Sequence, residues 1–182
     1  QKGDESYDGT GYPIVLGAGG PDDFGYIWID SDETGGPEFG FTDISTTGNP
    51  VFGLADDNIV GPYNIGFDFY FYGDTKSQFW VNSNGCIGFT SNEITLQNTT
   101  IPTNSSVYKD FIAWMWDDLV FRTGSSQVFY QSFPDKLIIQ FKNYEHYGQA
   151  NLFINAEMII CENGKIMLMY DNFAAGVTLN SC

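Results

Sequence analysis

Short segments in which apolar and polar residues alternate run through most of the chain, and they constrain its fold more than any other feature. From Tyr12 onward they are separated by Gly, Asn, Asp and Pro, which favour turns. Every second residue from Ile65 to Phe71 is apolar, so these side chains share one face of an extended strand. We therefore predict an all-β fold, an antiparallel sandwich of two sheets, jelly-roll-like or immunoglobulin-like.

Two hairpins can be placed by their turns. Residues 78–81 and 86–89 flank an Asn-Ser-Asn-Gly sequence, and Asn and Gly tolerate the positive φ that such a loop requires. Residues 127–133 and 136–142 flank a Pro-Asp turn. Both pairs are expected to be neighbouring antiparallel strands.

A third hairpin is predicted near the C-terminus. Asn163 and Gly164 form the residue pair that is favoured in type I′ turns, and apolar strands precede and follow them. A two-residue turn at this place would put Ile159 opposite Leu168 across the strands.

The charge balance excludes several classes of partner. Against 23 acidic residues stand 7 basic ones, a formal net charge of −16. Such a surface repels phosphate backbones and anionic lipid head groups, so we expect no nucleic acid partner. The longest apolar patches, such as residues 136–141, are far shorter than the 18 or so residues that cross a bilayer, so we expect no membrane insertion.

The chain is expected to form one domain with a leading arm. Its composition is 42% apolar, which is ample for a core. We predict that residues 1–20 are a flexible arm with an apolar segment, and that residues 21–182 are a single β-sandwich domain.

Three segments resemble nidogen-like (NIDO-type) extracellular domains. Residues 66–73 and 79–89 resemble the family's aromatic strand and its Asn-Gly strand, and residues 111–119 resemble its Trp-Asp-Asp segment. Residues 25–37 and 128–141 resemble a bacterial, surface-exported branch. The resemblance implies an extracellular β-rich module of matrix, adhesion or surface architecture, with no catalytic role.

The chain departs from the family pattern in two places. Trp114 stands where the family usually has proline, and related bacterial domains continue beyond a position like Asn180 into another strand, whereas this sequence stops at Cys182. A sandwich that is one strand short exposes an unpaired sheet edge, to which a neighbour's extended segment can add.

The candidate donor of that strand is the apolar segment of the arm. Tyr12, Ile14, Val15 and Leu16 alternate in the way a strand requires, and donation from copy to copy does not close on itself, so it builds fibres. The alternative is that this segment pairs within its own subunit.

Calcium is the candidate cofactor. Asp30, Asp32 and Glu33 offer oxygen ligands in a glycine-rich loop, an arrangement that suits Ca²⁺. The alternative is a solvated acidic turn. The adjacent aspartates at 56–57 and at 117–118 are weaker candidates, because neighbouring residues of a strand point to opposite faces.

Two covalent features are expected of an exported protein. Cys161 and Cys182 can form a disulfide, with Cys86 as a buried thiol; the alternative is three reduced cysteines. Asn98 and Asn104 each begin a sequence that fits N-glycosylation.

No catalytic constellation is recognisable. The only histidine, His146, lacks a Ser or Cys partner in a known arrangement and is expected to be a surface or hydrogen-bonding residue. We therefore expect no enzyme, but an extracellular or cell-surface structural or adhesive protein, a self-assembling filament subunit whose partners are its own copies or other surface proteins. The alternatives are a calcium-dependent glycan-binding module and a secreted hydrolase with paired carboxylates.

Overall fold

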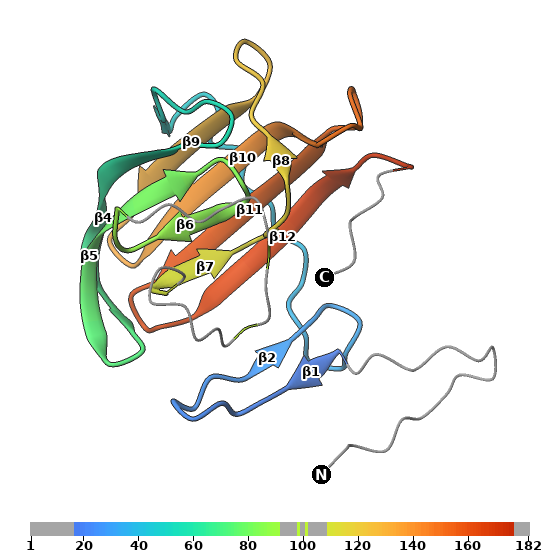
Figure 1. The fold of residues 1–182 in the computed structure, drawn as a ribbon. Coiled ribbons are helices and arrows are strands. Elements are labelled where there is room, and N and C mark those ends of the chain that lie inside the picture. The colour runs from blue at the N-terminus through green and yellow to red at the C-terminus, as the bar shows by residue number, and fades with distance from the viewer. Residues whose placement is uncertain (1–16, 92–97, 99–100, 102–108, 177–182) are drawn as a thin grey trace, which may run out of the picture. The chain divides into compact units, whose positions relative to one another are not determined.

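The protein is built from β-strands in two compact units. The computed structural model describes residues 17–91, 98, 101 and 109–176, and no helix occurs among them (Figure 1). The chain divides into Gln1–Gly40 and Phe41–Cys182, whereas the expected boundary lay after residue 20. The all-β prediction is confirmed.

The first unit is a small antiparallel ribbon. Strand β1 (Ala18–Gly19) pairs with β2 (Trp28–Ile29). Between them the Asp22 carboxylate accepts the backbone N–H groups of Phe24 and Tyr26, each at 2.9 Å. This local bonding is the usual reason for aspartate in a tight turn.

The second unit is a sandwich of two antiparallel sheets, as predicted. The larger sheet has the order β12-β11-β10-β9-β3, with β8 on β10, and the smaller has the order β4-β5-β6-β7. The strands are β3 (Asn49–Pro50), β4 (Ile59–Phe71), β5 (Asp74–Asn82), β6 (Cys86–Gly88), β7 (Phe111–Ala113), β8 (Leu119–Val120), β9 (Gln127–Ser132), β10 (Lys136–His146), β11 (Ile154–Cys161) and β12 (Ile166–Phe173).

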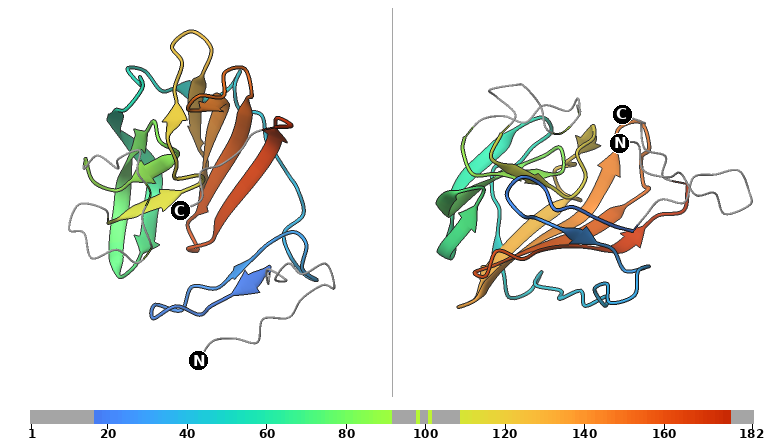
Figure 2. Two further views of the ribbon diagram at one scale, coloured as in Figure 1. Left: turned by 45° about the vertical axis from the view of Figure 1, so that its right-hand side comes forward. Right: turned by 90° about the horizontal axis from the view of Figure 1, so that it is seen from below.

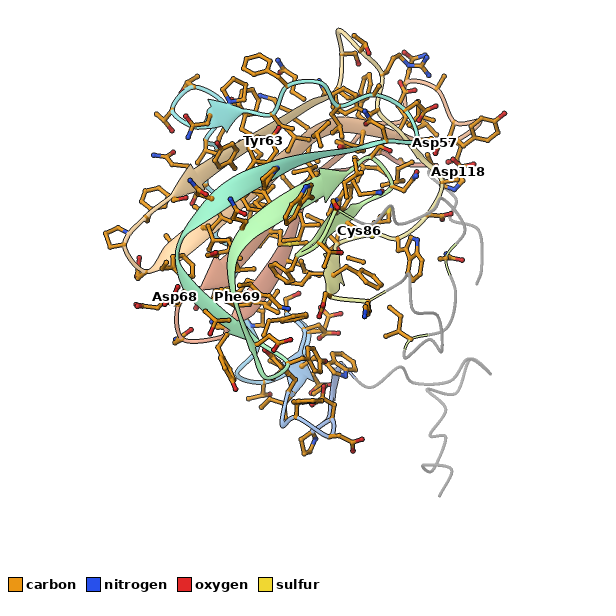
Figure 3. All side chains as sticks on the ribbon, turned by 60° about the vertical axis from the view of Figure 1, so that its left-hand side comes forward. Asp57, Tyr63, Asp68, Phe69, Cys86 and Asp118 are labelled. Atoms are coloured by element: carbon orange, nitrogen blue, oxygen red, sulfur yellow. The ribbon has the colours of Figure 1, made fainter. Side chains whose placement is uncertain are left out.

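The core lies between these sheets and is rich in aromatic rings. In β4, Phe69 is buried while the preceding Asp68 is exposed, which confirms the predicted alternation (Figure 3). Tyr63 of β4 and Tyr130 of β9 join the two sheets with ring centroids 5.0 Å apart. Trp114, at the position where proline was expected, is buried with its ring 4.9 Å from that of Phe141.

Two of the three predicted hairpins form as expected. Strands β5 and β6 pair around the Asn-Ser-Asn-Gly turn, with Val81 opposite Ile87. Strands β9 and β10 pair around the Pro-Asp turn, with Ser132 opposite Leu137.

The register predicted for the third hairpin is wrong by one residue. Ile159 lies opposite Met167 rather than Leu168. The Gly164 N–H donates to the Cys161 carbonyl, and the Cys161 N–H donates to the Lys165 carbonyl. Three residues therefore form the loop, with Gly164 at φ 87°, which is the three-residue turn with a glycine bulge rather than type I′.

A strap of residues 41–48 covers the outer face of the larger sheet. Its Ile44 side chain is 1% exposed and packs among Phe129, Ile138 and Ile159. Strands β10 and β11 are consequently buried on both faces.

Polar side chains of the sheet hold the strap's backbone in place. Gln140 accepts the Ile44 N–H at 2.9 Å and donates its amide to Asp43 at 3.0 Å. Both carboxylate oxygens of Glu157 lie within hydrogen-bond distance of the Thr42 N–H, at 3.3 and 3.2 Å. Each of these polar groups beneath the strap therefore has a partner, as burial requires.

Candidate functional site

Two of the three segments that carry the family resemblance, residues 79–89 and 111–119, meet at one end of the sandwich. The Gly85 carbonyl accepts the N–H groups of Trp114 and Met115, and the Asn84 side chain accepts the Leu119 N–H at 3.2 Å. The Asn-Gly turn and the Trp-Asp-Asp segment are therefore bonded to each other. Their residues are first of all required by the fold.

Glycine is needed at the centre of this contact. Gly85 has φ 78°, and a Cβ atom there would lie 1.6 Å from the Met115 carbonyl oxygen. The preceding Asn84 is buried and donates its side-chain amide to Asp57 at 3.1 Å. The turn thus ties a third segment, the loop before β4, to the same end.

Aspartates gather around this turn. Asp57 and Asp118 lie side by side in Figure 3, and burial together with the charges of Asp57 and Asp56 raises the pKa of Asp118. Burial and the charge of Asp57 likewise raise the pKa of Asp56. The sequence did not predict this proximity, because it depends on how the loops between strands pack. Among the described residues, no three acidic, histidine or cysteine side chains form a group that could hold a metal ion.

His146 lies close to this cluster. It is 3% exposed, so the prediction of a surface position is wrong, whereas the hydrogen-bonding role is confirmed. Its Nδ1 is 3.0 Å from the Tyr147 carbonyl oxygen and 2.9 Å from the Gln149 amide nitrogen. Its Nε2 is 3.3 Å from an Asp117 carboxylate oxygen, without hydrogen-bond geometry. Among the described residues, none of these contacts is with a hydroxyl or thiol group that the imidazole could activate as a nucleophile.

A buried carboxylate paired with arginine lies next to His146. Burial alone would raise the pKa of Glu145, but hydrogen bonds from Arg122 and from the Asn151 N–H outweigh it, and the pKa is lowered. The Arg122 guanidinium reaches the same carboxylate oxygen at 2.6 and 3.1 Å. The only arginine of the chain is thus engaged in structure.

The calcium candidates lie in the first unit. Asp30 accepts the Asp32 N–H at 3.0 Å, and Glu33 accepts the Gly17 N–H at 3.3 Å. Asp30 thus closes a local turn, Glu33 bonds to a residue sixteen positions away, and calcium binding stays a prediction.

The cysteines and the glycosylation sequences are only partly within the described residues. Cys86 is buried, as expected, and burial raises the pKa of its thiol. Cys161 forms no disulfide among the described residues, and Cys182 lies outside them. The Asn98 side-chain nitrogen donates to the Trp116 carbonyl at 3.0 Å, so a glycan on that nitrogen would have to replace this bond.

The predicted donor segment and one sequon cannot be placed. Residues 12–16 and Asn104 lie outside the described residues.

Strand β12 carries an apolar row that is more exposed than the residues opposite it. Leu168 and Tyr170 are 37% and 42% exposed, whereas Met158 and Ala156, which lie opposite them on β11, are 0% exposed. Ile166 belongs to the same row and is half-buried. We name Ile166, Leu168 and Tyr170 the β12 row. Cover by the smaller sheet therefore ends between β11 and β12.

The edges of the two sheets differ in how they are protected. Strand β4 is the edge of the smaller sheet; it contains Pro62, and its pairing with β5 is interrupted between Val60 and Tyr63 and again between Asn64 and Phe69. Proline and irregular pairing are devices that block edge-to-edge association. Strand β12 has no proline, its pairing with β11 is irregular at one place only, between Asn155 and Ala156, and no described strand pairs with its outer side.

Comparison with known proteins gives one match. The model of the family described as NIDO related matches residues 35–181, which include both sheets and both motif segments. Neither the curated proteins nor the solved structures give a match. The match covers most of the chain, and its motif segments form the bonded end described above: the chain belongs to the NIDO-related family.

Proposed function

We propose that this chain is a non-catalytic extracellular module of structural or adhesive kind, which assembles with copies of itself. The observation that carries the proposal is the exposed β12 row on an edge strand without proline, whereas the other long edge strand, β4, has a proline and two interruptions of its pairing. Exposed apolar side chains that form a row rather than lying singly favour an interface.

The extracellular location is supported by the family. NIDO-type domains are typically extracellular. The part of the chain that the structure describes contains no helix long and apolar enough to cross a bilayer. Export from the cell fits a module that works through contacts with its neighbours.

The non-catalytic role is supported by the way the titratable groups are used. His146 is buried, and Glu145 and Glu157 are bonded to an arginine and to the strap. A general acid or base has to reach the substrate's proton within hydrogen-bond distance, directly or through one water. These three groups thus serve the fold.

Negative-stain electron microscopy and sedimentation velocity across a concentration series test the proposal. We expect particles longer than one subunit, and a sedimentation coefficient that rises with protein concentration. The same samples in EDTA test whether calcium takes part, and a glycan array with and without EDTA tests the glycan-binding alternative. A monomer at every concentration contradicts self-assembly.

A further inference from the structure

We infer that the β12 row is the acceptor for an extended segment of a second copy, residues 12–16, which adds as a strand beside β7. This inference rests on the proposed function and names the surface and the partner that assembly would use. It is carried by three observations: where burial stops, which strand ends the smaller sheet, and how the donor's side chains alternate.

Burial stops one strand short of the sheet's edge. Neighbouring strands lie about 4.8 Å apart, so a layer that buries β11 completely and leaves β12 exposed is one strand narrower than the sheet it covers. The missing cover is a strand in the smaller sheet, not an addition to the larger one.

Strand β7 is the end of the smaller sheet on that side. It pairs with β6 and with no other described strand. Trp114 follows β7 directly, and its carbonyl accepts a hydrogen bond from the Tyr170 hydroxyl of β12. In Figures 1 and 2, β7 likewise runs on the side of the sandwich where β12 ends the larger sheet. A strand added to β7 would therefore lie over the β12 row.

The donor fits this place in length and in pattern. Residues 12–16 and the β12 row each span four residue steps, or about 14 Å when extended. Tyr12, Ile14 and Leu16 fall on one face of such a strand, three apolar side chains against three. Pro13 cannot donate a backbone hydrogen bond, which suits a strand that becomes the new edge of the sheet.

Charge favours this contact over others. Neither residues 12–16 nor the β12 row contains a charged side chain, in a protein of net charge −16. The contact between these two segments therefore buries no carboxylate. Donation to the next copy leaves that copy's own donor free to continue, so the product is an open series of subunits.

Matched lysine substitutions in the full-length chain test the inference. Leu168→Lys should raise the protein concentration for half-assembly at least about tenfold, because a charge would be buried in the interface. Tyr70→Lys, on the exposed face of the guarded edge strand β4, is the control and should change it little. On the donor, Ile14→Lys should act like Leu168→Lys, and Val15→Lys, on the opposite face, should not. Circular dichroism checks that each variant folds.

Thiol cross-linking distinguishes the occupants. Facing sheets lie about 10 Å apart, which is too far for a direct disulfide, so a short bifunctional maleimide is used. An Ile14→Cys chain mixed with a Leu168→Cys chain should give a mixed cross-linked dimer with this reagent, and replacing the second chain by Tyr70→Cys should not. A chain with both Ile14→Cys and Leu168→Cys that cross-links only within itself overturns the inference, because the segment then covers its own row. Polymers that form equally well with Leu168→Lys overturn the acceptor but leave self-assembly standing, whereas a wild-type chain that stays monomeric overturns the proposed function itself.

Discussion

Glu157 couples the ionisation of one carboxyl group to the folding of the protein. Burial raises its pKa to about 7 from 4.5, although the Thr42 N–H favours the charged form. The folded protein therefore binds the proton more tightly than the unfolded chain. The stability that this group contributes is full below about pH 4.5 and is lost as the pH rises towards 7, by on the order of 3 kcal/mol.

Replacing Glu157 by glutamine should remove that loss. Glutamine keeps an oxygen for the Thr42 N–H and does not titrate. We expect Glu157→Gln to be more stable than wild type above pH 7 and to have a flatter stability profile between pH 4.5 and 7, as measured by urea unfolding at each pH. The nearby Asp43 does not titrate between pH 4.5 and 7, because hydrogen bonds from Ser45 and Gln140 lower its pKa to about 2. The exposed Glu162→Gln is the control. If the free energy of unfolding changes equally with pH in Glu157→Gln and in the wild type, this interpretation is contradicted.

Gly85 is the residue at which a single methyl group should matter most. Gly85→Ala puts a Cβ atom 1.6 Å from the Met115 carbonyl oxygen and also has to adopt φ 78°. We expect a loss of at least about 3 kcal/mol in the free energy of unfolding. Gly124→Ala is the matched control, since Gly124 has φ 91° and no atom lies within 4 Å of the place that a Cβ would take, so that only a backbone cost of about 1 kcal/mol applies. Similar losses for both would show that the close contact relaxes freely.

At the scale of elements, the strap decides how the larger sheet is buried. It is attached by the Ile44 side chain and by backbone bonds to Gln140 and Glu157, and it leads directly from the first unit into β3. A sheet with one face on the core needs a second cover before glutamine and glutamate can lie buried on its other face. The strap supplies this cover.

Ile44→Ala should loosen the strap. The substitution leaves a cavity among Phe129, Ile138 and Ile159, and we expect it to cost about 3 kcal/mol, within the range for buried isoleucine. Amide hydrogen exchange at residues 42–48 should be faster in the variant than in the wild type, and the increase should be larger there than in the larger sheet. The exposed Ile27→Ala provides the control. Unchanged exchange in the strap would mean that the polar contacts hold it without the side chain.

Elements whose signals are local could be predicted from the sequence, and those set by distant contacts could not. The hairpin of β5 and β6 follows from its Asn-Gly turn, and the alternation in β4 follows from its aromatic residues. The slip in the hairpin of β11 and β12 arose because Asn-Gly serves both two- and three-residue loops. The strap has no periodicity of its own, and its partners are about a hundred residues away along the chain.

The same limit applies to the candidate site. The Trp-Asp-Asp segment and the Asn-Gly turn could be singled out from the sequence, but not that they bond to each other or that Asp57 joins them. A lone histidine at the end of a strand gives no signal of burial. The one available hint was the Glu145-His146 pair at the end of an apolar strand, where charged residues stay only if they have partners.

For the whole molecule, net charge opposes the assembly that the β12 row favours. Copies with a formal charge of −16 repel one another, and the Debye length falls from about 10 Å at 0.1 M to about 3 Å at 1 M ionic strength. Assembly should therefore strengthen with added salt, whereas an assembly held by ion pairs would weaken. Lowering the pH towards the sequence pI of about 4.1 at low ionic strength should act in the same direction, because it removes the repulsion without adding ions.

Light scattering along both series measures this balance, and Leu168→Lys separates specific assembly from precipitation. The variant changes the net charge by the same amount as Tyr70→Lys, so any repulsion that one lysine removes is removed equally in both. If the β12 row is the interface, only the Tyr70→Lys protein should follow the wild type in salt and in pH. If both variants follow it, the association comes from loss of charge alone, and the apolar row of the edge strand β12 is not what joins the subunits.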